Sequence, residues 1–374
     1  MKVVILTSTH PPFDVRVFYK IARTIAEAGH DVTYLLMYNG EGESDSEVDF
    51  ITIPRPKNRF MRVIKGRKLL KPALKLDADV YIINDTEILY LGKKLAKKGK
   101  KVVHDAMEPY PDFLAEKSWI PGFLKPLARR MATSAERRGC EKADGILVAM
   151  QENVDRLSCC NTPILTLHNY PRVEDILNDL PPKENSVIYV GGIMWARMGK
   201  EIVSMAKGFA PGGILDGWKL NVVGPIHYRG YGAECMDIAE KHRGKDYFNM
   251  SGKLEKYSNV LKMMTSARFG LSLVRPTRNY SQIVSSKVFD YMAKGTIPIA
   301  TWLPSYKGLI TEEAGPIFIQ SGDEGKVPQI IADLAERPQE MRERALTCMR
   351  SVREKYNWEA EGRELPSFLE NIVK

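Results

Sequence analysis

The sequence predicts an α/β protein with two successive doubly wound domains. Short apolar runs rich in β-branched residues alternate with helix-length segments, a pattern typical of parallel sheets covered on both faces. A polar, proline-containing stretch interrupts this alternation near the middle of the chain. The length of 374 residues also favours two domains of roughly 150 to 200 residues each.

Residues 1–168 are expected to form an N-terminal Rossmann-like domain. Its candidate strands are Val3–Leu6, Val32–Leu36, Phe50–Ile53, Val80–Ile83, Lys101–Val103, Gly145–Val148 and Ile164–Leu167. Val15–Ala28 is predicted to be a helix because Val17, Ile21 and Ile25 repeat at helical spacing. Gly29 is expected to end this helix.

Residues 169–185 lack a strong periodicity and are predicted to be a linker. Residues 186–356 are expected to form a second Rossmann-like domain. Its candidate strands are Val187–Val190, Lys219–Val222, Phe269–Leu273, Ile297–Ala300 and Ile317–Ile319, and its candidate helices include Gly199–Phe209 and Val260–Ala267. A final helix at about 357–374, which begins at an exposed-looking Trp358, need not belong to this domain and can pack back on the first.

Composition restricts the classes of function. The apolar run at Val3–Leu6 is too short for a signal peptide, and no run is long enough for a transmembrane helix, so we expect a cytoplasmic protein. The five cysteines form no metal-ligand pattern, and we expect neither a bound metal nor a disulfide framework. Two such α/β domains are expected to bind ligands in a cleft at the carboxyl ends of their strands.

The formal net charge of +9 is concentrated in one segment, Arg55–Lys75, which contains no acidic residue. Apolar residues alternate with its lysines and arginines, which is typical of a helix lying on an anionic membrane surface. A solvated helix face is an equally good interpretation. Nucleic acid is a weaker candidate partner, because no recognised nucleic-acid-binding motif accompanies the charge. We therefore expect a protein that can associate with the inner face of the cell membrane.

A candidate anion site lies in "IYVGGIMWARMGKE", Ile188 to Glu201. A strand leads into Gly191 and Gly192, whose backbone can approach a ligand closely. Arg197 and Lys200 then supply charge for phosphates beside a helix start. A plain turn is the alternative interpretation, because the spacing matches neither the Rossmann nor the Walker fingerprint.

The helix expected at "SSKVFDYMAKG" offers a second anion site in the same domain. Its apolar residues fall on one arc, with Lys287 and Asp290 on the opposite side. Lys287 lies in the first turn, where unpaired N–H groups and an ammonium can hold a diphosphate, and Asp290 can accept hydrogen bonds from a ribose. A surface ion pair between the two is the alternative.

The first domain has polar residues after two of its strands. His104 and Asp105, followed by Glu108, can position or deprotonate an acceptor hydroxyl, although a lone histidine is more often structural. His10, Asp14 and Arg16 follow the first strand and are candidate acceptor contacts. A helix cap at Asp14 and a surface cation at Arg16 are the alternatives to these contacts.

Several stretches in order resemble glycosyltransferase family 4, whose members have the GT-B fold. The resemblance rests on "HPPFDVRVFYKIARTIAEAGHDV", "VVHDAMEPYP", "LHNYP", "IYVGGI", "VVGP", "ARFGLSLVRPTRNY", "KVFDYMAKGTIPIAT", "EEAGPIFI" and "REKYNWEAEGREL". It covers nearly the whole chain, and the order of the motifs is more specific than any one of them.

The resemblance implies a retaining, hexosyltransferase-like enzyme that uses a UDP- or GDP-sugar without an obligatory metal. The second domain would bind the donor: Arg197 with Lys200, or Lys287, would neutralise the diphosphate, and Asp290 would hold the ribose. The first domain would bind a lipid-linked or polysaccharide precursor acceptor at the cytoplasmic membrane face.

Two positions depart from the family pattern. Gln282 occupies the place of the first of two glutamates, and Met107 stands where many relatives have a histidine. Gln282 can donate and accept hydrogen bonds but carries no negative charge. A catalytically silent binder of sugar nucleotides or membrane surfaces therefore remains an alternative, as does a sugar-nucleotide epimerase on the same fold.

Overall fold

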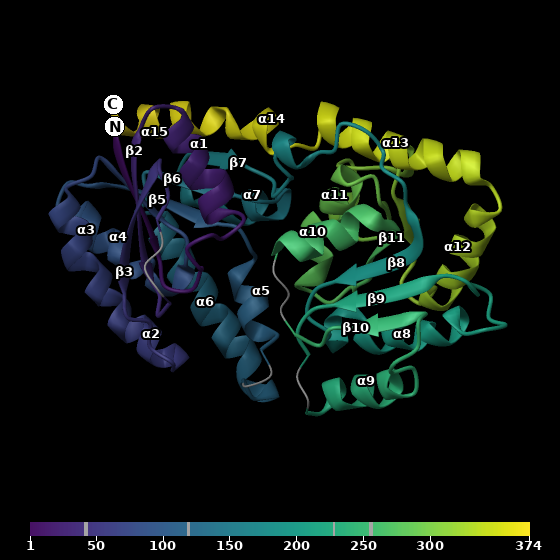
Figure 1. The fold of residues 1–374 in the computed structure, drawn as a ribbon. Helices are drawn as coiled ribbons and strands as arrows, with labels where there is room; N and C mark the ends of the chain where they lie inside the picture. Colours follow the sequence, from purple (N-terminus) through teal and green to yellow (C-terminus); the bar gives the residue numbers. More distant parts are fainter. Residues whose placement is uncertain (41–43, 118–119, 227–228, 254–256) are drawn as a thin grey trace. The chain divides into compact units, whose positions relative to one another are not determined.

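The computed structural model describes residues 1–40, 44–117, 120–226, 229–253 and 257–374. They divide into two compact units (Figure 1). Unit 1 contains Met1–Asn169 and Trp358–Lys374, and unit 2 contains Tyr170–Asn357. Each unit holds a parallel sheet with helices between its strands, which confirms the predicted α/β fold class.

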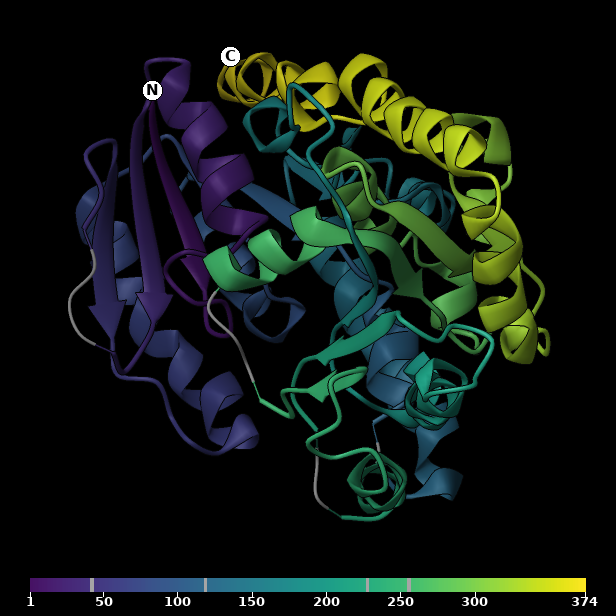
Figure 2. The same ribbon diagram turned by 45° about the vertical axis from the view of Figure 1, so that its right-hand side comes forward.

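The sheet of unit 1 has the strand order β3-β2-β1-β4-β5-β6-β7, and every neighbouring pair is parallel. In Figure 2 the purple strands from the start of the chain lie side by side, with the first helix beside them. The strands are β1 (Lys2–Thr7), β2 (Asp31–Met37), β3 (Val48–Ile53), β4 (Val80–Ile83), β5 (Lys101–Ala106), β6 (Gly145–Val148) and β7 (Ile164–Thr166).

Helices cover both faces of this sheet. Because successive side chains of a strand point to opposite faces, one strand contributes to two buried clusters. Val3 and Ile5 belong to one buried cluster, whereas Val4 and Leu6 belong to another. The helices are α1 (Arg23–Glu27), α2 (Arg59–Lys65), α3 (Leu70–Leu76), α4 (Tyr90–Ala96), α5 (Tyr110–Ala115), α6 (Lys125–Cys140), α7 (Gln151–Leu157), α14 (Trp358–Gly362) and α15 (Glu364–Val373). The helix expected over Val15–Ala28 is present as a π-helical turn followed by α1.

The sheet of unit 2 has the order β10-β9-β8-β11-β12-β13 and is also parallel throughout. Its strands are β8 (Glu184–Val190), β9 (Lys219–Val223), β10 (Phe248–Met250), β11 (Ala267–Ser272), β12 (Ile297–Thr301) and β13 (Ile317–Ile319). Its helices are α8 (Gly199–Ser204), α9 (Tyr231–Glu240), α10 (Tyr257–Ser266), α11 (Ser286–Ala293), α12 (Val327–Ala335) and α13 (Pro338–Glu354). The short strand β10 was not predicted, because three residues around Asn249 give no apolar run.

The stretch predicted to be a linker is packed against unit 2. Tyr170 and Ile176 lie in a buried cluster of that unit. The ammonium of Lys183 donates hydrogen bonds to the carbonyl oxygens of Thr265 and Lys294, at 2.7 and 2.6 Å. These contacts hold in place a segment whose sequence shows no strong periodicity.

The C-terminal helices belong to unit 1, and the expected exposure of Trp358 is wrong. Its side chain is only 1% exposed, and its indole Nε1 donates a hydrogen bond to Thr24 Oγ1 at 2.8 Å. Leu365 and Leu369 of α15 lie in the same cluster as Val3 and Ile5 of β1. None of the described helices combines the length and apolar character needed to cross a bilayer.

Candidate active site

Both sheets have a point where the strand order reverses, between β1 and β4 in unit 1 and between β8 and β11 in unit 2. In open α/β sheets, ligands bind outside the carboxyl ends of the strands at such a point, because the chain leaves in opposite directions there. The residues that follow these strands therefore define two candidate ligand-binding sites, one in each unit.

In unit 1 a cavity of about 570 Å³ opens at this point, and we call it the polar cavity. Its lining includes His10 after β1, Asn84 and Asp85 after β4, and Asp105 and Glu108 at and after the end of β5. Three neighbouring strands thus contribute polar groups to one hollow.

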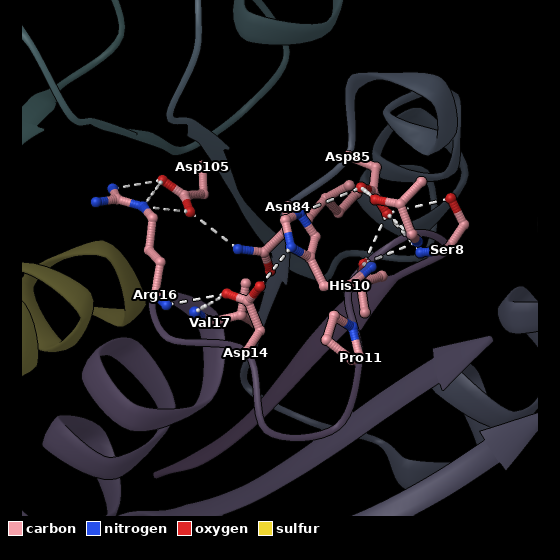
Figure 3. A network of polar contacts seen from close by, with 12 residues as sticks. Ser8, His10, Pro11, Asp14, Arg16, Val17, Asn84, Asp85 and Asp105 are labelled. Carbon is pink, nitrogen blue, oxygen red and sulfur yellow. Dashed lines mark hydrogen bonds and ion pairs between the residues drawn. The ribbon is translucent and has the colours of Figure 1, made fainter. Parts of the chain in front are cut away.

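Asp85 organises the loop after β1 (Figure 3). Its Oδ2 accepts hydrogen bonds from Thr7 Oγ1 at 2.8 Å, Ser8 Oγ at 3.1 Å and the Thr9 backbone N–H at 3.2 Å. With its lone pairs occupied in this way, Asp85 is better suited to positioning the loop than to accepting a proton. Asn84 and Asp85 were not predicted as site residues, although they directly follow the predicted strand Val80–Ile83, just as His104 follows the predicted strand Lys101–Val103.

His10 lies between two carboxylates. Its Nδ1 is 3.1 Å from Asp14 Oδ2, and its Nε2 is 3.6 Å from Asp85 Oδ1. Burial lowers the pKa of His10, but the hydrogen bond to Asp14 and the charges of Asp85, Asp14 and Asp105 together outweigh it and raise the pKa. Asp14 Oδ1 also accepts the backbone N–H groups of Arg16 and Val17, each at 2.9 Å, so Asp14 caps the turn that follows.

Arg16 is a buried ion-pair partner, not the surface cation considered above. Its Nη2 lies 2.7 Å from Asp105 Oδ1, its Nε lies 3.0 Å from Asp105 Oδ2, and its Nη1 donates to the Leu167 carbonyl at 2.8 Å. Asn84 Nδ2 adds a hydrogen bond of 2.9 Å to Asp105. Arg16 is outside the lining of the polar cavity, so its contacts favour a structural role over contact with an acceptor.

His104 is also outside that lining. It is fully buried on β5, and its Nδ1 lies 3.0 Å from the carbonyl oxygen of Ile83 on the neighbouring strand. This arrangement favours the structural interpretation of His104. Met107 and Glu108, which follow it in sequence, do line the cavity.

In unit 2 two cations converge on the backbone after β8. A Cβ atom placed on Gly191 would lie 3.1 Å from Lys287 Cε and 3.2 Å from Arg197 Nη1. Gly191 has a φ of 143°, a conformation that favours glycine. A Cβ atom on Gly224 would lie only 2.1 Å from the carbonyl oxygen of Gly191. We call Arg197 and Lys287 the cationic pair.

The pKa of Lys287 is lowered from its ordinary value. Burial, with a further contribution from the charge of Arg197, lowers the pKa of Lys287 to about 7, and the charge of Asp290 opposes the shift. Two cations held together in this way gain from an anion placed between them. Arg197 is oriented by a hydrogen bond from its Nε to Tyr280 Oη at 3.0 Å.

Helix α11 presents Lys287 from its first turn. Ser285 stands at the N-cap position without a side-chain cap hydrogen bond, and its hydroxyl instead lies 2.9 Å from Ser272 Oγ. The first-turn N–H groups are thus not capped by that side chain. Val288, Phe289 and Met292 are buried, as the predicted amphipathic arc requires.

The other predicted donor contacts are placed differently. Lys200 forms an ion pair with Glu234 of α9, so a carboxylate of this chain already balances its charge. Gln282 Nε2 donates to the Arg278 carbonyl at 2.6 Å, and the carbonyl of Gly192 accepts a 2.9 Å hydrogen bond from Tyr189 Oη. Asp290 follows Lys287 by one helical turn and is partly buried. In the described part of the chain, no group of three His, Cys, Asp or Glu side chains is placed to hold a metal ion.

Solved structures match this architecture along the whole chain. Sucrose-phosphate synthase from Thermosynechococcus elongatus matches with a TM-score of 0.76 at 15% identity, covering 99% of this chain and 98% of that one. The chain has the GT-B fold. HepE from Anabaena in complex with UDP-glucose gives a TM-score of 0.71 at 12% identity, with 99% and 100% covered.

A UDP-forming α,α-trehalose-phosphate synthase from Burkholderia xenovorans, in complex with glucose-6-phosphate, gives a TM-score of 0.66 at 12% identity with both chains fully covered. No protein-family model matches the sequence, and no curated protein matches it significantly. At these identities the GT-B neighbours establish the fold alone.

Proposed function

We propose that this protein is a retaining glycosyltransferase that moves a sugar from a UDP- or GDP-sugar to an acceptor hydroxyl. The observation that carries the proposal is the convergence of Arg197 and Lys287 over Gly191, at the switch point of the second sheet. A nucleotide sugar brings a diphosphate that matches two cations, and HepE was solved with such a donor.

In this proposal the diphosphate lies against the cationic pair and the first turn of α11. When the bond from the anomeric carbon to the phosphate oxygen breaks, the diphosphate gains negative charge, which the two cations stabilise. Asp290 holds the ribose. The departing phosphate oxygen takes the proton of the attacking hydroxyl on the same face of the sugar, so the anomeric configuration is retained.

The acceptor is assigned to the polar cavity of unit 1, where His10 and Glu108 offer polar groups to hydroxyls. A lipid-linked or polysaccharide precursor acceptor fits a protein held at the cytoplasmic membrane face by Arg55–Lys75. That segment forms α2, α3 and the turn between them, and Val63 and Ile64 are exposed among its cations.

Nucleotide release from UDP- and GDP-sugars, measured with and without acceptor, tests the proposal. Lys287→Ala is expected to lower turnover about 10²–10³-fold, the loss that follows removal of one oxyanion-stabilising donor from a hydrolase. Lys207→Ala, which removes an exposed lysine of the same unit, is the matched control and should retain full turnover.

Two other outcomes would contradict the proposal. Tight nucleotide binding without turnover for any acceptor would favour a silent binding protein, the alternative raised by Gln282 and Met107. A sugar that stays on the nucleotide but changes configuration, detected by product analysis, would favour an epimerase.

A further inference from the structure

A second cavity in unit 1, of about 750 Å³, has an apolar lining, and we call it the apolar groove. One wall is formed by Leu127 and Met131 of α6 together with Leu124 at its N-cap position. The lining also includes Tyr90 at the start of α4 and Leu114 of α5. The volume lies within the range of small-molecule sites, roughly 300 to 1,000 Å³.

The α6 wall is an apolar stripe at helical spacing that the described part of the fold leaves uncovered. Leu124, Leu127 and Met131 are 40%, 55% and 64% exposed. The opposite side of α6 is anchored, because Glu136 and Cys140 are fully buried there. A helix normally buries its apolar stripe, and a contiguous exposed patch of this kind marks a binding surface.

The apolar groove is continuous with the polar cavity. Val63, Thr86, Glu87, Tyr110 and Leu114 line both hollows. A molecule lying across this junction therefore meets hydroxyl-binding groups at one end and hydrocarbon-lined walls at the other.

The polar cavity also holds a buried donor, which precedes Val63 of the junction in sequence. Arg62 is only 8% exposed and lines the polar cavity, and its Nε has no hydrogen-bond partner among the described residues. A buried guanidinium N–H without a partner is costly, so an oxygen acceptor from a ligand would stabilise it.

The outer lining of the groove is cationic. Lys93, Arg138 and Lys142 are exposed and line it, whereas Glu87 at the junction is the acidic residue among the described lining residues. Cations around an apolar opening complement the anionic headgroups of a membrane surface. This charge pattern favours an amphipathic molecule drawn from a lipid surface over an apolar partner from solution.

We propose that the apolar groove holds the hydrocarbon chain of an amphipathic acceptor whose hydroxyl-bearing headgroup lies in the polar cavity. The inference rests on the proposed glycosyltransferase function, and within it selects a lipid-linked acceptor over a free sugar or soluble glycan. Arg62 then contacts an oxygen of the headgroup in the polar cavity.

The experiment measures binding of hexyl, octyl and decyl β-glucosides, and of glucose, by calorimetry below their micelle concentrations. Affinity is expected to rise by up to about fourfold for each added methylene that becomes buried. The double variant Leu127→Gln with Met131→Gln should lose this chain-length dependence, and both side chains are exposed enough to be replaced without unfolding. Leu346→Gln on α13, also an exposed leucine, is the control and should retain it.

The outcomes separate this inference from the proposed function. Equal affinity for all chain lengths, or an unchanged dependence in the double variant, would overturn the inference even if nucleotide release were normal. Dimerisation that the double variant abolishes would show that the groove covers a second copy instead. Intact chain-length dependence without nucleotide-sugar turnover would leave the groove assignment standing and overturn the transferase proposal.

Discussion

At the scale of single residues, the most informative group is Lys287. Its sequence position is compatible with an ordinary surface ion pair to Asp290. In the fold it lies beside Arg197, and its pKa falls to about 7 through burial and that neighbouring charge. A lysine held at this pKa is half protonated near neutrality, so binding an anion is coupled to taking up a proton.

This coupling predicts the pH dependence of donor binding. Above pH about 7 the free protein has lost the Lys287 proton, whereas a bound diphosphate raises the pKa and restores it. Affinity for a nucleotide sugar should therefore fall as pH rises, by up to about tenfold per unit. Isothermal calorimetry at pH 6 to 9 measures this slope. A nucleotide sugar is a suitable ligand for it, because its diphosphate carries no terminal phosphate group that would itself ionise at about pH 6.

Lys287→Met should remove the slope, while Lys207→Met should keep it. If wild type and Lys287→Met showed the same dependence on pH, the cationic pair would not be the donor site.

A second prediction concerns the buried ion pair between Arg16 and Asp105. Asp105→Ala leaves a guanidinium that is 3% exposed without its carboxylate, which should lower the free energy of unfolding by about 3–5 kcal/mol. Urea denaturation measures the change. Glu141→Ala, which breaks the exposed Arg137–Glu141 pair, is the control and should cost no more than about 1 kcal/mol.

A small effect of Asp105→Ala on stability with a large loss of turnover would instead return Asp105 to the catalytic role predicted from the sequence.

At the scale of elements, the position of α11 depends on a glycine in the strand beneath it. A Cβ on Gly270 of β11 would lie 2.4 Å from Tyr291 Cγ. Tyr291 in turn accepts a hydrogen bond from the Val190 backbone N–H at 3.1 Å, just before Gly191. Gly270 thus allows α11 to approach the sheet closely enough for Lys287 to reach the carboxyl end of β8.

Gly270→Ala is therefore expected to push α11 outward, lower the free energy of unfolding by about 1–3 kcal/mol and weaken donor binding. Denaturation and calorimetry on the same sample measure both effects. Gly325→Ala has no atom within 4 Å of the new Cβ and should change neither. Unchanged donor binding in Gly270→Ala would mean that α11 does not set the position of Lys287.

At the scale of the whole molecule, the chain leaves unit 1 after Asn169 and returns to it at Trp358. The return is fixed by burial of Trp358 and by the hydrogen bonds that Glu361 accepts from His168, at 2.7 Å from the backbone N–H and 2.8 Å from Nδ1. Figure 1 shows α15 near both chain ends in unit 1. Unit 1 is thus completed by contacts between residues that are distant in sequence.

The sequence by itself determined the two parallel sheets, because strands covered on both faces must be apolar at nearly every position. It also determined that Gly191 and Arg197 follow a strand of the second domain and that Lys287 lies in the first turn of a helix of the same domain. Only the tertiary structure decided which polar residues work together. Arg16 and Asp105 form an ion pair in the interior, and Lys200 forms one with Glu234. Asp85 accepts hydrogen bonds from the loop after β1. The apolar groove was likewise undetectable in sequence, since its walls come from helices separated by many residues and meet only when the chain is folded.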